Sequence, residues 1–191
     1  REFVEDFGPY KLVAREVDGK HYGILWRTET NSPAVKLIQI TASSTDEAKA
    51  MVEASFYQSR LDQVSPNETA AANQQQIVRA WMYIWPHLNP NQKLMITAQY
   101  HASDRQMTTT QLATIVKWEG HSGVNLWYGY AGFMMFGECP RELPIDEKSG
   151  KPVFSFALSN GWYEDTTDGK RWVWEMRPEI AEGLKLTGLI A

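Results

Sequence analysis

Two Asp-Gly pairs, one near each end of the chain, constrain the fold more than any other feature. Both residues of such a pair tolerate a positive φ angle, so the pair favours a two-residue hairpin turn. Asp18-Gly19 joins residues 10–17 to residues 20–27, and Asp168-Gly169 precedes the alternating residues 171–176. Alternation with a period of two is typical of strands that bury one face. The sequence therefore predicts an antiparallel hairpin in each half of the chain.

Residues 1–62 are expected to form a small β-β-β-α unit. Residues 35–41 alternate like the hairpin strands before them and predict a third strand. Ser44 and Glu47 then match a capping box, S-x-x-E, which satisfies two free N–H groups at a helix start. The predicted helix runs from about Thr45 to Leu61. Small or apolar residues form its inner stripe: Ala48, Met51, Val52, Ser55 and Phe56.

The order of these elements resembles the small antitoxin fold of HicB proteins and their double-stranded-RNA-binding-like relatives. The resemblance covers residues 1–62 and rests on arrangement, not on a motif. The alternative is a generic three-stranded sheet with one helix packed on it, and for function we prefer this alternative.

Residues 63–73 predict a linker between two domains. They contain Ser65-Pro66-Asn67 and a run of alanines, which is a loop-like composition. A helix is expected from about Gln74, because Ile77 begins a series of apolar residues at helical spacing. Pro86 is expected to end this helix.

Residues 74–191 are expected to form a winged-helix-like unit. Asn89-Pro90 places a capping residue before a proline at the first helical position. Thr108 and Gln111 form a second capping box, and a third helix is predicted from about Ser122 to Phe136. Helix, short helix, tight turn and helix is the outline of a helix-turn-helix.

A β-hairpin and a closing helix complete the predicted winged helix. Residues 152–163 are strand-like, Asp168-Gly169 supplies the turn, and residues 171–176 form the return strand. A short helix follows at about residues 179–186. The predicted fold class is therefore α+β, a β-β-β-α unit followed by a helix-turn-helix with a β-hairpin wing.

The second half contains three notable phrases: Tyr100 to Ala113, Val124 to Gly129 and Trp174 to Leu184. They resemble segments of bacterial restriction-type proteins, and the resemblance spans roughly residues 90–190. In that family the segment looks like an accessory domain joined to an HNH nuclease domain. The resemblance implies a link to DNA and phage defence. No HNH-like metal cluster follows, so the resemblance implies the reading or docking part without the cutting part, or a stand-alone relative with another role.

Composition excludes several other classes. The formal net charge of −4 and the absence of a long basic run argue against strong non-specific binding to nucleic acid. One cysteine, Cys139, excludes an internal disulfide and a cysteine-based zinc site. No apolar run is long enough to span a bilayer, so no membrane partner is expected. Because the sequence starts at Arg1 with no signal-peptide pattern, we expect a trimmed chain or a fragment in a cytoplasmic setting.

The third predicted helix offers polar side chains that would read DNA if it entered the major groove. Asparagine pairs with adenine through two hydrogen bonds, and serine and tyrosine contact phosphate. Basic residues in the turn and the wing would add backbone contacts. The predicted nucleic-acid-binding residues are Lys117, His121, Ser122, Asn125, Tyr128, Lys170 and Arg171. The absence of Lys and Arg from the helix itself is the main argument against ordinary groove binding.

Eight tryptophans form the other unusual feature of the sequence. One interpretation is that their large rings fill the cores of small domains, and we prefer it. The other is an aromatic pocket that stacks an extruded or modified base.

The leading functional hypothesis is a non-catalytic DNA-interacting module of a restriction or phage-defence type system. Its specificity would come from DNA shape or base contacts more than from charge. The alternative is a protein-interaction module, antitoxin-like or a nuclease-partner adaptor, that docks a partner or a second copy without binding nucleic acid. An enzyme is the least favoured class, because no acid–base, nucleophile, cofactor or metal-ligand pattern is present.

Overall fold

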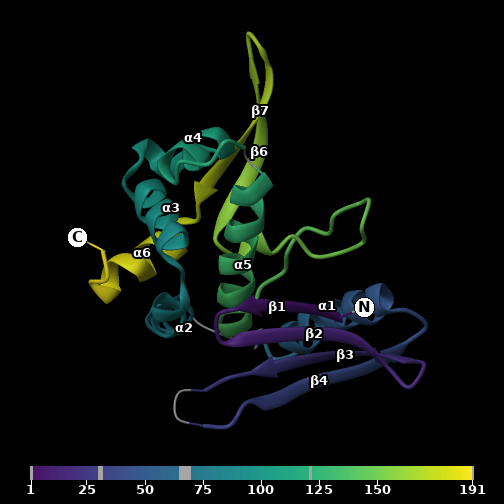
Figure 1. The fold of residues 1–191 in the computed structure, drawn as a ribbon. Helices are drawn as coiled ribbons and strands as arrows, with labels where there is room; N and C mark the ends of the chain where they lie inside the picture. Colours follow the sequence, from purple (N-terminus) through teal and green to yellow (C-terminus); the bar gives the residue numbers. More distant parts are fainter. Residues whose placement is uncertain (1, 30–31, 65–69, 121, 191) are drawn as a thin grey trace. The chain divides into compact units, whose positions relative to one another are not determined.

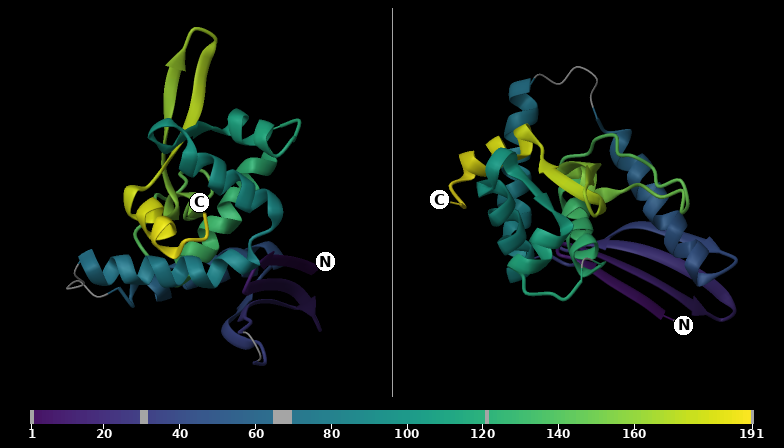
Figure 2. Two further views of the ribbon diagram at one scale, coloured as in Figure 1. Left: turned by 90° about the vertical axis from the view of Figure 1, so that its left-hand side faces the viewer. Right: turned by 90° about the horizontal axis from the view of Figure 1, so that it is seen from above.

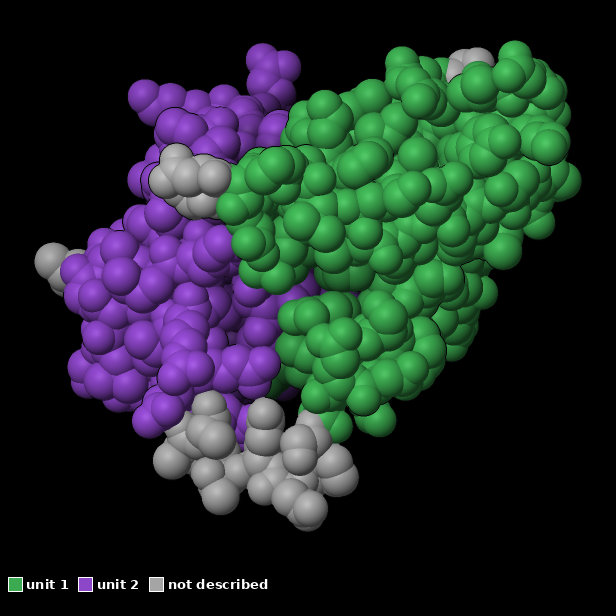
Figure 3. Space-filling view, turned by 90° about the horizontal axis from the view of Figure 1, so that it is seen from below, with its two compact units in different colours: residues 1–65, 140–153 green, residues 66–139, 154–191 purple. Residues whose placement is uncertain are grey.

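A computed structural model describes residues 2–29, 32–64, 70–120 and 122–190 (Figures 1 and 2). The described residues form a mixed α+β structure with a four-stranded antiparallel sheet, several helices and a small three-stranded sheet. The chain divides into two compact units, coloured separately in Figure 3. Unit 1 comprises residues 1–65 and 140–153, and unit 2 comprises residues 66–139 and 154–191.

Unit 1 contains four strands in sequential order and one long helix. The elements are β1 (Glu2–Phe7), β2 (Tyr10–Val17), β3 (Lys20–Arg27), β4 (Val35–Ala42) and α1 (Thr45–Leu61). The predicted hairpin at Asp18-Gly19 is confirmed, with Val17 paired to Lys20. The prediction of three strands was wrong, because β1 pairs with β2 along its whole length. Half of β1 is acidic, a composition with low β propensity, so pairing and not propensity places it in the sheet.

The core of unit 1 lies between α1 and one face of the sheet. Leu12, Ala14 and Leu25 are fully buried, together with Val52 and Phe56 of α1. Figure 2 shows α1 lying across one face of the sheet. Side chains alternate along a strand, so the residues between these buried ones belong to the opposite face.

Gly23 allows α1 to approach the sheet closely. A Cβ atom at this position would lie 2.5 Å from the carbonyl oxygen of Ala48 and 2.7 Å from a methyl carbon of Val52. A backbone oxygen cannot be moved aside by a change of rotamer. Glycine is therefore required where β3 crosses beneath α1.

Ser44 caps α1 as the capping-box pattern predicts, but Glu47 uses a different partner. The Glu47 N–H donates to Ser44 Oγ at 3.1 Å. The Glu47 carboxylate accepts the backbone N–H of Ser43 at 2.8 Å, together with the Ser43 hydroxyl. These hydrogen bonds lower the pKa of Glu47 from its ordinary value.

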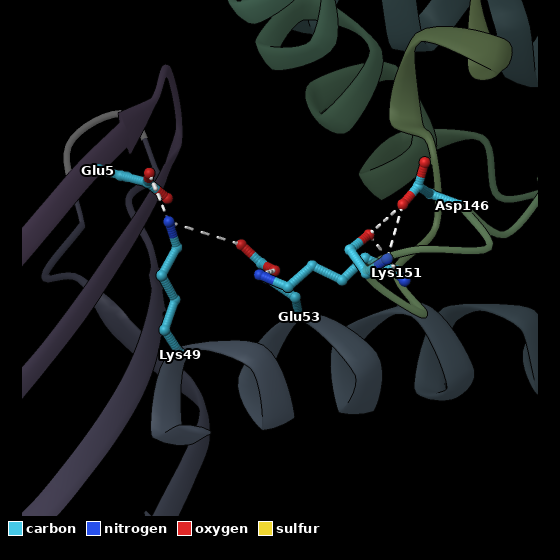
Figure 4. A network of polar contacts seen from close by, with 6 residues as sticks. Glu5, Lys49, Glu53, Asp146 and Lys151 are labelled. Atoms are coloured by element: carbon cyan, nitrogen blue, oxygen red, sulfur yellow. Dashed lines mark hydrogen bonds and ion pairs between the residues drawn. The ribbon is translucent and has the colours of Figure 1, made fainter. Parts of the chain in front are cut away.

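Residues 140–153 pack on α1 as part of unit 1, although the sequence division assigned them to the second unit. The Tyr57 hydroxyl accepts the N–H of Leu143 at 3.0 Å. Lys151 Nζ lies 2.8 Å from Glu53 Oε2, and Lys49 Nζ lies 2.6 Å from Glu5 Oε1 (Figure 4). Lys49 Nζ is also 4.0 Å from Glu53 Oε1, so these charges form one network.

Unit 2 contains the remaining elements. They are α2 (Ala70–Ile84), η1 (Trp85–His87), α3 (Pro90–His101), η2 (Ser103–Arg105), β5 (Gln106–Thr108), α4 (Thr109–Ile115), α5 (Ser122–Glu138), η3 (Phe154–Ala157), β6 (Ser159–Thr166), β7 (Gly169–Met176) and α6 (Pro178–Thr187). Part of the predicted linker at 63–73 is helical, because α2 begins at Ala70 and alanine has the highest helix propensity. Residues 65–69 lie outside the described residues.

A three-stranded sheet in the order β5-β7-β6 organises unit 2. The predicted hairpin is confirmed, with Thr166 paired to Gly169, but its first strand begins at Ser159 and not at 152. Residues 154–157 form η3 instead. β5 was not predicted, because three residues carry too little alternation to reveal a strand. Figures 1 and 2 show the hairpin of β6 and β7 extending beyond α4.

The main core cluster of unit 2 joins its helices to this sheet. Its buried members come from α3, α4, the segment after α4, α5 and β7: Met95, Leu112, Ala113, Val116, Val124 and Trp174. Another contact ties α2 to α6, where Trp81 Nε1 donates to the carbonyl of Ile180 at 2.9 Å. The core cluster therefore packs α3, α4 and α5 against β7, and the Trp81 hydrogen bond joins α2 to α6.

Candidate nucleic-acid interface

The capping box predicted at Thr108 sets the start of α4. The N–H of Gln111 donates to Thr108 Oγ1 at 3.1 Å, and the N–H of Thr108 donates to Gln111 Oε1 at 2.8 Å. The chain then leaves α4 at Val116 and adopts a positive φ of 58° at Lys117. This sharp exit brings α5 back across α4, and both helices contribute to the core cluster.

The first turns of α5 present a mostly uncharged surface to solvent. Ser122 and Asn125 are exposed, as predicted for residues that read bases. Leu126 is 49% exposed, and Trp127 and Tyr130 are partly exposed. The carbonyl of Trp127 accepts a hydrogen bond from Gln92 Nε2 at 2.9 Å, which fixes α5 to α3. This face has polar and aromatic groups for contact, and no cation.

Tyr128 was predicted to point outward, and the structure places it in the core instead. It is fully buried, and its hydroxyl donates to Gln99 Oε1 at 2.5 Å and also contacts Ser159 Oγ. Burial raises the pKa of Tyr128 well above its ordinary value. The spacing of Val124, Tyr128 and Ala131, at i, i+4 and i+7, was the sequence signal that could have identified this buried stripe.

The two wing cations are exposed but paired within the hairpin. Arg171 Nε donates to Glu164 Oε2 at 2.6 Å across the strands. Lys170 Nζ lies 3.8 Å from Asp165 Oδ1. Exposed ion pairs of this kind contribute about 0–1 kcal/mol, so each cation can exchange its partner at small cost. The wing therefore offers little uncompensated positive charge.

Of the remaining two predicted contacts, Lys117 and His121, the structure describes only Lys117. Lys117 is exposed at the end of α4, close in sequence to the start of α5. His121 lies outside the described residues. Of the predicted set, the structure therefore brings Lys117, Ser122 and Asn125 to the surface near the α4–α5 connection.

A second polar region surrounds the connection between α3 and β5. Asp104 and Arg105 both have positive φ angles, 52° and 57°, which non-glycine residues rarely adopt. A hollow of about 460 Å³ is lined here by Tyr100, Ala102, Asp104, Arg105 and Glu175. The Arg105 guanidinium lies 5.9 Å from the centroid of the Tyr100 ring. These positive φ angles are a property of the backbone that no sequence pattern at this segment reveals.

The tryptophans of unit 2 mainly fill its interior. Trp81 and Trp174 are buried, and the ring of Trp174 packs edge-on against Phe156 and Trp172. Among the described side chains, the indole N–H groups of Trp172 and Trp174 are buried without a hydrogen-bond acceptor. In contrast, a tyrosine of the hairpin is exposed. Tyr163 is 66% exposed, and its ring packs on Trp172. These positions favour core filling over a base-stacking pocket for most of the rings.

The described part of the chain contains neither a cluster of metal-binding side chains nor a helix that could span a membrane. Histidine, cysteine and acidic side chains form no group of three or more that could bind a metal ion there. None of the described helices has the length and apolar character needed to cross a membrane.

Comparison with known proteins identifies no relative of this chain. The chain matches no protein-family model, and neither a curated protein nor a solved structure is significantly similar to it.

Proposed function

We propose that the chain is a non-catalytic DNA-interacting module, and that unit 2 engages duplex DNA as a winged helix. The observation that carries the proposal is the pairing of β5 with β7 in a sheet of order β5-β7-β6. A winged helix has the same sequence of elements: a helix, a short strand, two helices of a helix-turn-helix, and a hairpin whose second strand pairs with the short strand. Here these are α3, β5, α4, α5 and β6–β7.

In this arrangement α5 is the helix that enters the major groove. Asn125 and Ser122 are exposed on its first turns, and asparagine can pair with adenine through two hydrogen bonds. The helix carries no Lys or Arg, so phosphate contacts would come from Lys117 and from the wing. The proposal therefore includes modest affinity, with specificity from base contacts and DNA shape.

We further propose that this module acts in a restriction or phage-defence type system. This proposal rests on the three phrases of unit 2 that resemble the accessory domain of restriction-type proteins. Two of them, at residues 100–113 and 124–129, coincide with the end of α3, β5, α4 and the first turns of α5. The second phrase includes Asn125 on α5, which the proposal places at the base edges.

The proposal is tested by fluorescence anisotropy with short labelled duplexes of varied sequence, plain and cytosine-modified, at low and physiological salt. Loss of one bidentate base contact in Asn125→Ala should weaken binding to the preferred duplex about 5- to 100-fold. Asn73→Ala is the matched control, because Asn73 is an exposed asparagine of α2, a helix that the proposal does not place at DNA. Absence of duplex binding at low salt would contradict the proposal.

A protein-interaction module is the second candidate, and one observation favours it. The wing cations are paired with Glu164 and Asp165, while Leu126 of α5 and Ile115 of α4 are 49% and 37% exposed. Light scattering that reveals self-association, together with no binding to any duplex, would support this candidate. Leu126→Ser should then lower the association constant.

A further inference from the structure

We infer that the uncovered face of the unit 1 sheet binds single-stranded nucleic acid by stacking bases on Tyr22 and Trp26. The site is separate from the proposed duplex interface of unit 2, and the inference does not rest on that interface. Its evidence is the register of the four strands, the partial exposure of the two aromatic rings and the charge of the residues around them.

The strand register identifies which residues share this face. Gly23 and Leu25 of β3 are buried beneath α1, so Tyr22, Ile24 and Trp26 belong to the other side of the sheet. All three are partly exposed. Tyr22 and Trp26 are four residues apart on one strand, a distance of about 13 Å along the chain. Two bases of an extended strand can therefore stack on them separately.

The second packing layer of unit 1 lies on the opposite side of the sheet. α1 contacts β2, β3 and β4 through the buried face. Residues 140–153 contact α1, through a hydrogen bond to Tyr57 and an ion pair with Glu53. Within the described residues of unit 1, the face that carries Tyr22 and Trp26 is therefore left without a covering helix.

The charge of this face complements a phosphate backbone. Four of its residues are exposed cations, and their positions follow from the register: Lys11, Arg15, Lys20 and Lys36. The carboxylates on the same face belong to the edge strand β1, where Glu2 is opposite Arg15 and Asp6 is opposite Lys11. Lys36 is paired in register with Trp26, and Lys20 precedes Tyr22 on β3. Cations without a facing carboxylate thus lie next to each aromatic ring, on a chain whose formal net charge is −4.

Aromatic rings on an open sheet, with cations beside them, are what single-strand recognition requires. Each base has a π face that stacks on tyrosine or tryptophan whatever its identity, and the cations contact the backbone. A duplex does not fit this surface equally well, because its bases are already stacked on one another. The inferred ligand is therefore a single-stranded segment of DNA or RNA, with little preference for sequence.

The experiment measures binding of labelled oligo(dT) and oligo(U) to the full chain by anisotropy over a series of salt concentrations. Trp26→Leu and Tyr22→Leu keep an apolar side chain but remove the ring, and each should weaken binding about 5- to 100-fold. Trp26→Phe should restore most of the affinity. Tyr163→Leu is the matched control, because it removes an exposed ring from unit 2 and should leave binding unchanged.

A second variant tests the lysine contacts and leaves the aromatic rings unchanged. Lys20 and Lys36 are exposed, so replacing both by Gln should not disturb the fold. If both contact phosphate, the slope of log affinity against log salt should fall by about 1.4. Ultraviolet crosslinking should attach oligo(dT) to a peptide that contains residues 20–26.

Several results would overturn the inference. One is the absence of single-strand binding at low salt. Another is binding that the Trp26 and lysine variants leave unchanged, or that crosslinks outside β3. Loss of binding in Tyr163→Leu alone would assign the single strand to the wing. Duplex binding that Asn125→Ala removes while oligo(dT) binding persists would leave this inference intact and separate it from the proposed function.

Discussion

The two hairpins of this protein begin from the same local pattern and present different chemistry. Both turn at an Asp-Gly pair, and both carry aromatic rings and lysine or arginine near the turn. On β6–β7 the cations face Glu164 and Asp165 across the strands, and Trp174 faces the helices and is buried. On β3 the rings of Tyr22 and Trp26 stay on the side away from α1, and Lys36 faces Trp26.

The difference teaches that the side chains a hairpin presents to solvent are decided by its cross-strand partners and by the layer packed on it. A lysine opposite a carboxylate is compensated, whereas a lysine opposite an aromatic ring keeps its charge available for a ligand. A tryptophan covered by helices fills a core. A tryptophan on an uncovered sheet can stack a ligand. Three pairs of substitutions and one single substitution test how far the neighbours of a side chain decide its contribution.

The largest difference is expected between two strand glycines. In Gly23→Ala the new methyl would meet the backbone oxygen of Ala48 at 2.5 Å, so α1 must move away from the sheet. In Gly161→Ala the new methyl would meet ring atoms of Trp172 at 2.5 Å and of Trp174 at 2.8 Å, so side chains and not the backbone must adjust, and of the two rings only Trp172 is partly exposed. We expect the free energy of unfolding to fall by about 3 kcal/mol in Gly23→Ala and by about 1 kcal/mol in Gly161→Ala. Calorimetry of both variants checks this, and equal losses would contradict the argument from backbone rigidity.

The next effect concerns two tyrosines of unit 2. Tyr128→Phe removes a buried hydroxyl and leaves Gln99 and Ser159 with one hydrogen-bond partner fewer, at a cost of about 1–3 kcal/mol. Tyr163→Phe removes an exposed hydroxyl and should change stability by less than about 0.5 kcal/mol. Urea denaturation of the two variants measures the difference. A neutral Tyr128→Phe would mean that the buried polar cluster contributes nothing to stability.

A smaller effect distinguishes a partly buried ion pair from an exposed one. Glu53→Gln removes the carboxylate near Lys151 and Lys49, whose side chains are 38% and 20% exposed. Glu164→Gln removes the exposed partner of Arg171 and should cost at most a few tenths of a kcal/mol. We expect residues 140–153 of Glu53→Gln to exchange amide hydrogens faster, with no such change around the hairpin in Glu164→Gln. Unchanged exchange in both would show that the ion pair of Glu53 with Lys151 does not hold this segment.

The smallest effect is a dependence on pH at the start of α1. Hydrogen bonds from Ser43 lower the pKa of Glu47, so the carboxylate stabilises the folded state while it is ionised. This contribution is complete above the ordinary glutamate pKa and is lost as the pH falls through the lowered value. The protection factors of amides near Ser43, which are corrected for the intrinsic pH dependence of exchange, should therefore fall in acid. In Glu47→Gln the exchange should be faster at neutral pH and should lack the acid step, and an unchanged acid step would assign it to another group.

Local sequence signals predicted many of the individual elements. The two Asp-Gly turns, the cap at Ser44 and the capping boxes at Asn89 and Thr108 form as their residue types require. Each depends on φ preference or on a hydrogen bond between residues three apart, so the information is contained in a few neighbouring residues. Ser122 and Asn125 are exposed as expected for polar residues in the first turns of α5, whereas most of the later residues of that helix are buried.

Other features required the tertiary structure, because their causes lie far apart in the sequence. β1 and β5 are strands only because β2 and β7 offer them partners. Residues 140–153 pack on α1 through contacts with residues more than eighty positions earlier, and Tyr128 is buried because Gln99 and Ser159 meet its hydroxyl. The compensated charges of the wing and the uncovered rings of β3 also depend on strand register, which pairs residues across the sheet. By itself the sequence determined where the chain turns and where its helices begin, and the packing of distant segments decided which side chains remain available for a ligand.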